Sequence, residues 1–318
     1  MEKDLRSNAF FSDNERYADI INGFGCEGDT FVKGEDLQEL DTRMVHDKTR
    51  RKGGRRTPPL YRDLLRKASF GVNFAIVGIE NQEEIDYALP LRIMQYDAGT
   101  YEHQISKIRK SVRAEGKKLS AGEYMYGFKK DNKLWPTVTF VLYFGEKDWD
   151  GARDIYGMLD FADIPKSLKE KVSNYQIHVI EVRKLTDTSF LKTDVKQVFD
   201  FIRFSKDKRK LKELIENDSV YSQMDEDAYD LAVAYTGDED MFKLKEKHKK
   251  GGKVNMCQGL AEWLADERAE GKAEGEAVGS ERMSRLIIVL TEQGRQEDLL
   301  KAAKDSRYRE ELLEELII

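Results

Sequence analysis

Three polar residues near the ends of two expected strands have the side chains that hydrolytic chemistry needs. Asp63 lies in a strand expected over residues 61–68, and Glu80 and Gln82 lie in a strand expected over residues 73–82. Successive side chains of a strand alternate between its two faces, so Glu80 and Gln82 project from the same face. If the two strands pair through the short turn between them, Asp63 lies beside both.

Two carboxylates at the end of a buried strand pair are costly unless a cation neutralises them, and a divalent metal with oxygen ligands would do so. A hard metal next to a basic surface suits phosphodiester cleavage, because it activates water and stabilises charge on the phosphate. The alternative is a pair of strand-end acids that are only hydrated. Spacing does not choose between them, since the same Glu-x-Gln pattern recurs at residues 102–104 in an expected helix.

The elements around these residues can be read from the apolar pattern. Phe74–Ile79 is almost continuously apolar, as expected of a strand covered on both faces. Pro90 is well placed in the first turn of a long helix that ends near Val112. Further strands are expected at 137–144 and 175–182, and the apolar spacing becomes helical after residue 193. The sequence therefore predicts three parts: an α/β domain over residues 1–190, a helical region over 191–260, and a low-complexity linker with C-terminal helices over 261–318.

The distribution of charge points to a nucleic-acid partner, although the total of 54 basic and 60 acidic residues gives a net charge of −6. Residues 48–67 contain nine basic residues and one acid, and residues 105–118 contain six basic residues and one acid. Residues 213–240 contain ten acids and no base, which suggests a solubilising or self-inhibiting surface. A single basic stretch is often only a solvated face, but two of them flank the candidate site.

Several classes of protein are disfavoured. No apolar run approaches the roughly 20 residues of a membrane-spanning helix, and the N-terminus shows no secretory signal, so we expect a cytoplasmic protein with no membrane contact. Cys26 and Cys257 are far apart and form no metal-binding pair. The four histidines lack the spacing of a zinc site.

At the candidate residues the sequence resembles a known family. The segments that carry the resemblance are Tyr61–Lys67, Gly78–Gln82, Tyr87–Asp97, and Pro136–Gly145 with Trp149–Gly151. In this order they resemble the PD-(D/E)XK nuclease family transposases, the Rpn-type recombination-promoting nucleases, over roughly residues 8–185. The resemblance implies a restriction-endonuclease-like fold, an α/β mixed sheet flanked by helices, followed here by a helical C-terminal region. It also implies DNA cleavage that depends on Mg²⁺ or Mn²⁺.

The resemblance assigns roles to individual residues. Asp63 and Glu80 would hold the metal, and Gln82 would orient the nucleophile where the wider superfamily has a lysine. A glutamine supplies no positive charge, and Arg62 stands where the superfamily name has a proline. The residues expected to contact DNA are Arg55, Arg56, Arg62, Arg66, Lys67 and Arg92. Asp19 is a further candidate for an acidic role at the site. Tyr96 lies one helical turn from Arg92 and could also face the phosphate. For Asp19, Tyr96 and Arg92, the alternative is a plain structural role.

The resulting hypothesis is a metal-dependent DNA endonuclease that hydrolyses phosphodiester bonds in recombination or transposition. The alternative is a cleavage-inactive DNA-binding or self-associating protein that keeps the same fold. In either case the C-terminal helices could join copies of the chain into a homo-oligomer.

Overall fold

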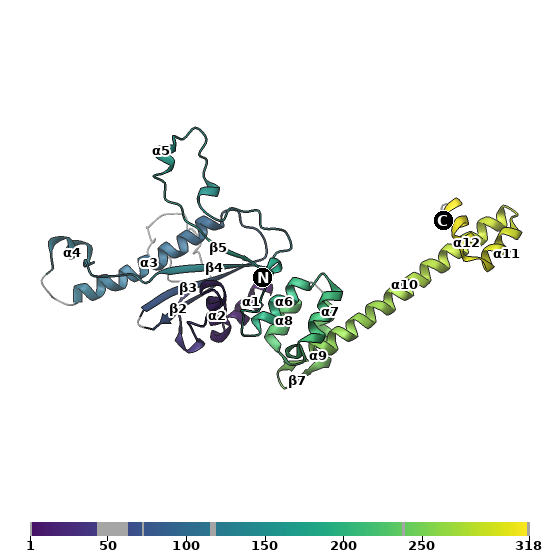
Figure 1. The fold of residues 1–318 in the computed structure, drawn as a ribbon, viewed down its shortest axis with the longest axis horizontal. Helices are drawn as coiled ribbons and strands as arrows, with labels where there is room; N and C mark the ends of the chain where they lie inside the picture. Colours follow the sequence, from purple (N-terminus) through teal and green to yellow (C-terminus); the bar gives the residue numbers. More distant parts are fainter. Residues whose placement is uncertain (1, 43–62, 72, 115–118, 237–238, 317–318) are drawn as a thin grey trace, which may run out of the picture. The chain divides into compact units, whose positions relative to one another are not determined.

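The structure is a computed structural model that describes residues 2–42, 63–71, 73–114, 119–236 and 239–316. The chain forms two compact units, Met1–Cys257 and Gln258–Ile318 (Figure 1). Residues 191–257, most of the helical region 191–260 that the sequence sets apart, thus belong to the same unit as the α/β part. The expected mixed α/β class and the helical C-terminal region are confirmed.

A five-stranded mixed sheet forms the centre of the first unit. The strands are β1 (Leu37–Glu39), β2 (Leu64–Phe70), β3 (Asn73–Gln82), β4 (Thr137–Tyr143) and β5 (His178–Glu181), and they lie in this order. β1, β2 and β3 are antiparallel neighbours, whereas β3, β4 and β5 run parallel. The β2–β3 turn contains Gly71 at φ +67°, a left-handed conformation that glycine adopts without strain.

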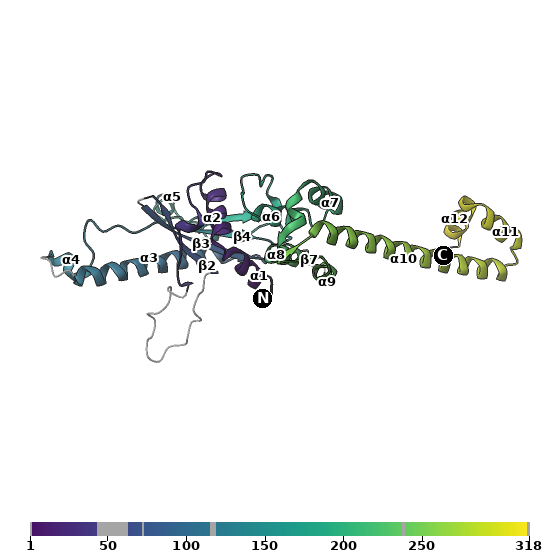
Figure 2. The same ribbon diagram turned by 90° about the horizontal axis from the view of Figure 1, so that it is seen from below.

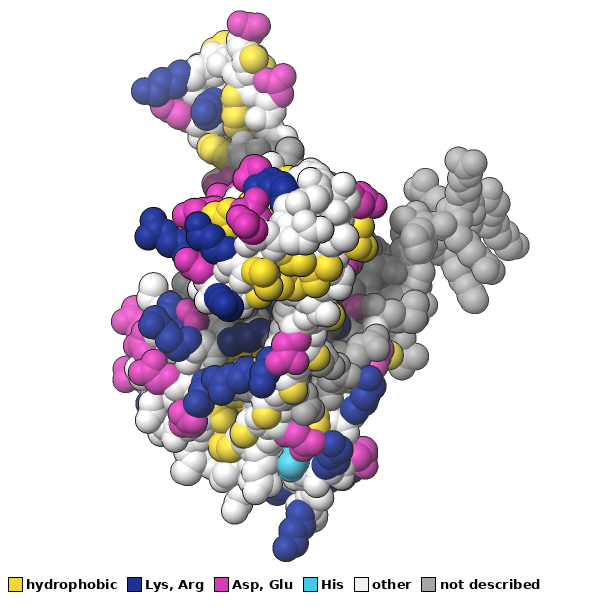
Figure 3. Space-filling model, turned by 90° about the vertical axis from the view of Figure 1, so that its right-hand side faces the viewer, with side chains coloured by type: hydrophobic (Ala, Val, Ile, Leu, Met, Phe, Trp, Pro, Cys, Tyr) yellow, Lys and Arg dark blue, Asp and Glu magenta, His cyan; other side chains and the backbone are white. Residues whose placement is uncertain are grey.

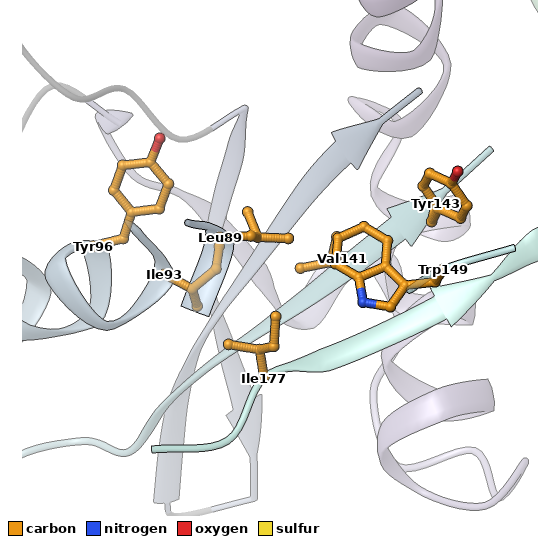
Figure 4. Packing of buried hydrophobic residues seen from close by; sticks show 7 residues of the cluster. All are labelled: Leu89, Ile93, Tyr96, Val141, Tyr143, Trp149 and Ile177. Atoms are coloured by element: carbon orange, nitrogen blue, oxygen red, sulfur yellow. The ribbon is translucent and has the colours of Figure 1, made fainter. Parts of the chain in front are cut away.

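Helix α3 (Leu89–Ala114) connects the parallel strands β3 and β4 and covers one face of the sheet. Its buried residues Leu89, Ile93 and Tyr96 pack against β4 side chains, Trp149 and Ile177 (Figure 4). Thr139 Oγ1 donates to Asp97 Oδ1 at 2.9 Å, which ties the helix to β4 with a buried polar contact. The start of α3 is therefore fixed beside the ends of β3 and β4.

Helices α1 (Glu2–Phe11) and α2 (Asn14–Ile20) contribute to the opposite face. The Tyr17 hydroxyl donates to the Val77 carbonyl at 2.7 Å, so α2 is bonded directly to β3. The Phe11 ring stacks on Phe144 with the ring centroids 6.5 Å apart, and it meets Phe199 edge-to-face at 6.2 Å. The apolar side chains of β3 are therefore covered by helices on both faces of the sheet.

The remaining elements of the first unit are short. The helices are α4 (Ala121–Tyr126), α5 (Lys166–Lys169), α6 (Val195–Phe204), α7 (Lys208–Asn217), α8 (Glu226–Ala234) and α9 (Glu239–His248). Single helical turns are η1 (Ile21–Gly25), η2 (Gly34–Asp36), η4 (Tyr156–Met158), η5 (Val182–Lys184) and η6 (Ser219–Gln223). A small sheet in the order β6 (Met224–Asp225), β8 (Lys253–Val254), β7 (Lys249–Lys250) lies in the part where the sequence predicts only helices.

Ion pairs and hydrogen bonds between distant segments explain why the helical stretch joins the α/β part. The Arg16 guanidinium, on α2, contacts Asp194 at 2.7 Å, and it also pairs with Asp227 at the start of α8. Arg183 donates to the carbonyl oxygens of Ile202 and Tyr235 at 2.9 and 2.7 Å. These contacts join residues that are distant in sequence, so the change of pattern near residue 190 does not separate two packed bodies.

The second unit consists of most of α10 (Met256–Glu292) with α11 (Gln296–Lys304) and α12 (Ser306–Glu315). The Gly- and acid-rich segment 269–277, which lies in the part where the sequence analysis expects a low-complexity linker, is helical. Leu286 and Leu290 of α10 pack on Ala302, Leu312 and Leu313. Among the helices that the structure describes, none is long and apolar enough to cross a membrane.

Asp19 is a structural acceptor in the fold. Its side chain is 4% exposed and accepts hydrogen bonds from the backbone N–H groups of Lys192 and Thr193 at 2.9 and 2.8 Å. Thr193 Oγ1 adds a bond at 2.7 Å. The expectation of an extra acidic catalytic role is therefore corrected: Asp19 fixes the segment that leads into α6.

Asp19→Ala should lower the free energy of unfolding by about 2–3 kcal/mol, because two buried N–H groups lose their acceptor. Urea denaturation followed by circular dichroism measures this difference.

Asp29→Ala is the matched control, since Asp29 is exposed, and it should change stability by less than about 0.5 kcal/mol. Equal stability of the Asp19→Ala protein and the wild type would contradict the structural role.

Candidate functional site

Asp63, Glu80 and Gln82 lie at one end of the β2–β3 hairpin. The register pairs Leu64 with Ile79, and Asp63 directly precedes β2, so continuing the register places Asp63 opposite Glu80. Asp63 Oδ2 accepts a hydrogen bond from the Asn81 backbone N–H at 2.8 Å. The structure therefore brings the two predicted metal-binding carboxylates to the same strand end.

Glu80 is a buried carboxylate, 5% exposed, and faces helix α3. Arg92, in the first turn of that helix, donates to Glu80 Oε1 at 2.9 Å and to Asp86 Oδ2 at 2.7 Å. Asp86 also accepts from the Ala88 N–H at 2.8 Å, in the turn that leads into the helix. Arg92 thus supplies the positive charge that a buried carboxylate requires.

Gln82 shares the face of Glu80 and the same arginine. In the amide orientation that satisfies both of its polar atoms, Gln82 Oε1 accepts from Arg92 at 2.6 Å and Nε2 donates to the Glu84 carbonyl at 3.2 Å. Although the glutamine carries no charge, a guanidinium lies within hydrogen-bond distance of it. Gln82 therefore has a cation beside it, which helix α3 supplies.

Asp63 has an environment that disfavours its charged form. Burial raises the pKa of the Asp63 carboxyl above its ordinary value, opposed by the Asn81 and Asn8 hydrogen bonds and by the positive charge of Arg92, while Asp4 adds to the rise. Asp63 also lines a cavity of about 440 Å³ with Glu39, Asp41 and Arg66 among its walls. An acid of raised pKa beside a cavity is a pattern common at functional sites.

The residues on the other face of β3 were missed by the sequence reasoning. Asn81 Nδ2 donates to Asn8 Oδ1 on α1 at 2.9 Å, and Asn8 also bonds to Asp63. Asn81 lies inside the Glu80–Gln82 triplet, and strand alternation alone directs it away from its neighbours. The role of Asp86 could have been predicted from the sequence, because an aspartate shortly before an expected helix start is a common turn and capping residue.

Two predicted phosphate contacts lie inside the protein instead. Arg66 is 3% exposed, and its guanidinium donates to Asn14 Oδ1 and to the Ser12 carbonyl at 3.2 Å each. Tyr96 is 2% exposed and belongs to the core beneath α3. In this structure both side chains are therefore engaged in packing and hydrogen bonds within the protein, and contact of either with a phosphate stays a prediction.

The other predicted DNA contacts differ in position. Lys67 is partly buried with Nζ above the Phe74 and Trp135 rings at 3.7 and 4.1 Å, a cation–π arrangement. Arg92 is at the site itself, bonded to Glu80. Arg55, Arg56 and Arg62 lie outside the described residues.

The acidic segment 213–240 is not a separate negative surface among the described residues. Glu226 contacts Lys245 and Lys249 at 2.8 Å each, Asp230 contacts Lys245 at 2.8 Å, and Asp225 contacts Lys253 at 2.7 Å. Figure 3 shows Lys and Arg side chains interspersed with Asp and Glu side chains over the face that it draws. These acids bind the protein's own bases, which argues against the expected self-inhibiting surface.

The donor set suits a hard divalent cation in part. Asp63 and Glu80 provide carboxylate oxygens and Gln82 an amide oxygen, and Mg²⁺ is commonly bound by one or two carboxylates with water and substrate phosphate completing its shell. Within the described residues no group of three or more His, Cys, Asp or Glu side chains is placed to hold a metal. A cation at this site would thus depend on water and substrate for most of its ligands.

Comparisons of the chain with known protein families, with curated proteins and with solved structures give no match.

Asp63→Asn should raise the free energy of unfolding at pH 7. The folded pKa lies above the unfolded one, so ionising Asp63 costs stability as pH rises, whereas asparagine stays neutral and can still accept from Asn81. Denaturant midpoints at several pH values measure this, and the advantage of the variant should vanish at a pH low enough to protonate Asp63 in the wild type. A variant less stable than the wild type at pH 7 would show that Asp63 serves the fold.

Proposed function

We propose that this protein is a metal-dependent DNA endonuclease that hydrolyses phosphodiester bonds. The observation that carries the proposal is the convergence of Asp63, Glu80, Gln82 and Arg92 at one end of the β2–β3 hairpin, although they come from two strands and a helix. A buried Glu80 and a half-buried Asp63 at one strand end, with a guanidinium bonded to Glu80, are expensive to maintain for stability alone. Such groups are more readily explained by chemistry on a charged substrate.

The wider architecture supports the same proposal. A mixed sheet with helices on both faces is what the resemblance to PD-(D/E)XK nuclease family transposases implies, and a restriction-endonuclease-like fold is part of the proposal. The candidate acids occupy strand ends, and a cavity opens beside Asp63. Recombination or transposition is the process to which the resemblance would assign the activity.

Each residue has a defined task in this proposal. Asp63 and Glu80 would hold Mg²⁺ or Mn²⁺, which supplies charge stabilisation at the phosphate and lowers the pKa of water. Gln82 would orient the attacking water through its amide. Arg92 would bind a phosphate oxygen, because its guanidinium suits bidentate contacts and its bonds to Glu80 and Asp86 hold it in place.

A second candidate function follows from the Arg92–Glu80 pair. With N–O contact at 2.9 Å, the arginine gives Glu80 a counter-ion without any metal. A protein that binds DNA or its own copies but does not cleave would keep this pair as a purely structural contact.

Asp63→Asn and Glu80→Gln should each slow Mg²⁺-dependent nicking of supercoiled DNA by about 100-fold or more, since metal-assisted charge stabilisation contributes several kcal/mol. Purified wild type should nick with Mg²⁺ or Mn²⁺ and be inactive in EDTA.

Glu35→Gln is the matched control, because Glu35 is an exposed carboxylate on η2, and it should cleave like the wild type. Nicking by Asp63→Asn at the wild-type rate would remove the catalytic assignment. Absence of wild-type cleavage with Mg²⁺, Mn²⁺ and Ca²⁺ would favour the non-cleaving protein.

Divalent cations should also stabilise the folded chain, by about 2.7 kcal/mol when the free ion is at 100 times its Kd. A thermal denaturation series in Mg²⁺ and Ca²⁺ should therefore show a rising midpoint for the wild type and a constant midpoint for Glu80→Gln. Arg92→Gln should show a larger rise than the wild type, because Glu80 has lost its protein counter-ion. Identical responses of the wild type and Glu80→Gln would place the bound ion elsewhere.

A further inference from the structure

The far end of α3 and the segment after it form a projecting arm, defined as the described residues 105–114 and 119–135. Figures 1 and 2 show α3 extending beyond the sheet, with α4 at its far end. Two contacts hold the returning segment against the helix. Arg109 Nε donates to the Tyr126 carbonyl at 3.1 Å, and Gln104 exchanges two hydrogen bonds with the Trp135 backbone, at 2.8 and 3.1 Å.

The arm carries large side chains that the fold does not bury. Tyr124 is 77% exposed and Tyr126 is 65% exposed, with the exposed Met125 between them. Tyr124, Met125, Val112 and Arg113 are among the residues that line a cavity of about 610 Å³. Single exposed apolar residues are ordinary, but three in succession beside a hollow mark a surface for a partner.

The same arm is strongly basic. Its described residues include seven basic side chains and two acids, and the basic ones are Lys107, Arg109, Lys110, Arg113, Lys129, Lys130 and Lys133. Lys107, Lys110 and Arg113 are exposed and follow one another along α3 at three-residue spacing, so they form a stripe. A backbone of phosphates could follow this stripe.

We propose that the arm binds a single-stranded segment of DNA, with bases stacked on Tyr124 and Tyr126 and phosphates along Lys107, Lys110 and Arg113. The proposal rests on the proposed function only for the choice of DNA as the substrate. Exposed aromatic rings beside a basic groove are how proteins hold unpaired nucleotides, because every base has a face that can stack. Bases within a duplex are already stacked on each other and offer no such face.

The charge of the arm disfavours the same arm of a second copy as the occupant. Two arms brought together would place like charges side by side, whereas a nucleic acid supplies both the anions and the planar groups that the surface lacks. An anionic membrane would share the anions but not the stacking geometry.

The rigid helix sets the distance between the arm and the candidate site. Arg92 and Arg113 lie on the same helix, which rises about 1.5 Å per residue, so they are about 32 Å apart. This distance corresponds to about nine base pairs of duplex DNA. The substrate would therefore have unpaired nucleotides about one helical turn from the cleaved bond, as in tailed or branched DNA.

The test is fluorescence anisotropy in EDTA with a labelled oligothymidine and with a duplex of the same length. The double variant Tyr124→Ala with Tyr126→Ala should bind the single strand about 10-fold or more weakly, and the duplex within about twofold of wild type. Tyr124→Phe with Tyr126→Phe keeps the rings and should bind like the wild type. Lys110→Gln should reduce the slope of log affinity against log salt by about 0.7, whereas the tyrosine variants leave it unchanged.

Wild-type affinity of the double alanine variant for the single strand would overturn the proposal. The proposal would also be overturned if the protein bound phosphatidylserine-containing vesicles through the tyrosines but did not bind the oligonucleotide. Glu35→Gln, which lies outside both the arm and the candidate site, should bind like the wild type. If the wild type binds the single strand through the tyrosines but never cleaves DNA, the proposed function is refuted and the role of the arm stands. If the wild type and the double alanine variant cleave tailed DNA equally well, the role of the arm is refuted and the proposed function stands.

Discussion

The burial of the Glu80 carboxylate is the constraint on which the candidate site depends. A carboxylate at the end of a central strand loses water on both sides, and the fold must return an equivalent charge. Arg92 does so at 2.9 Å, and it reaches Glu80 only because α3 begins directly beside the ends of β3 and β4. The packing of Leu89 and Ile93 against β4 therefore also fixes the electrostatics of the site.

The same constraint determines how the charges of the site are shared. Arg92 contacts Glu80, Gln82 and Asp86 together, so the guanidinium has alternatives if a cation takes part of Glu80. Asp63 differs from Glu80, because burial raises the pKa of Asp63 and so disfavours its charged form. A nearby cation would lower this pKa again. The site therefore combines one acid that has a protein counter-ion with one acid whose charged form burial disfavours.

Local patterns in the sequence predicted the elements that carry the site. The two-residue alternation of β3 placed Glu80 and Gln82 on one face, and the apolar stripe with Pro90 located α3. Alternation also shows why a basic stretch was a poor guide to a surface. Arg66 and Lys67 are neighbours in sequence, yet they project from opposite faces of β2, one to be buried against α2 and the other above two aromatic rings.

Contacts between distant segments could not be predicted in this way. Asp19 is bonded to Lys192 and Thr193, and Arg16 to Asp194 and Asp227, and no local pattern announces a partner so far along the chain. A count of acids over 213–240 likewise suggested a free negative surface, whereas the lysines that neutralise it lie in α9 and the strands after it. Acidic residues that cluster in the sequence can thus be paired in the folded protein with basic residues from another segment.

Helix α3 joins these features into one mechanical unit. Its first turn supplies the cation at Glu80, its middle packs on β4, and its last turns carry the basic stripe of the arm. Because an uninterrupted helix transmits position with little bending, a strand held by the arm has a defined offset from the site. Selection of the bond to be cut would then follow from the length of the helix, so no base-specific contact is needed at the acids themselves.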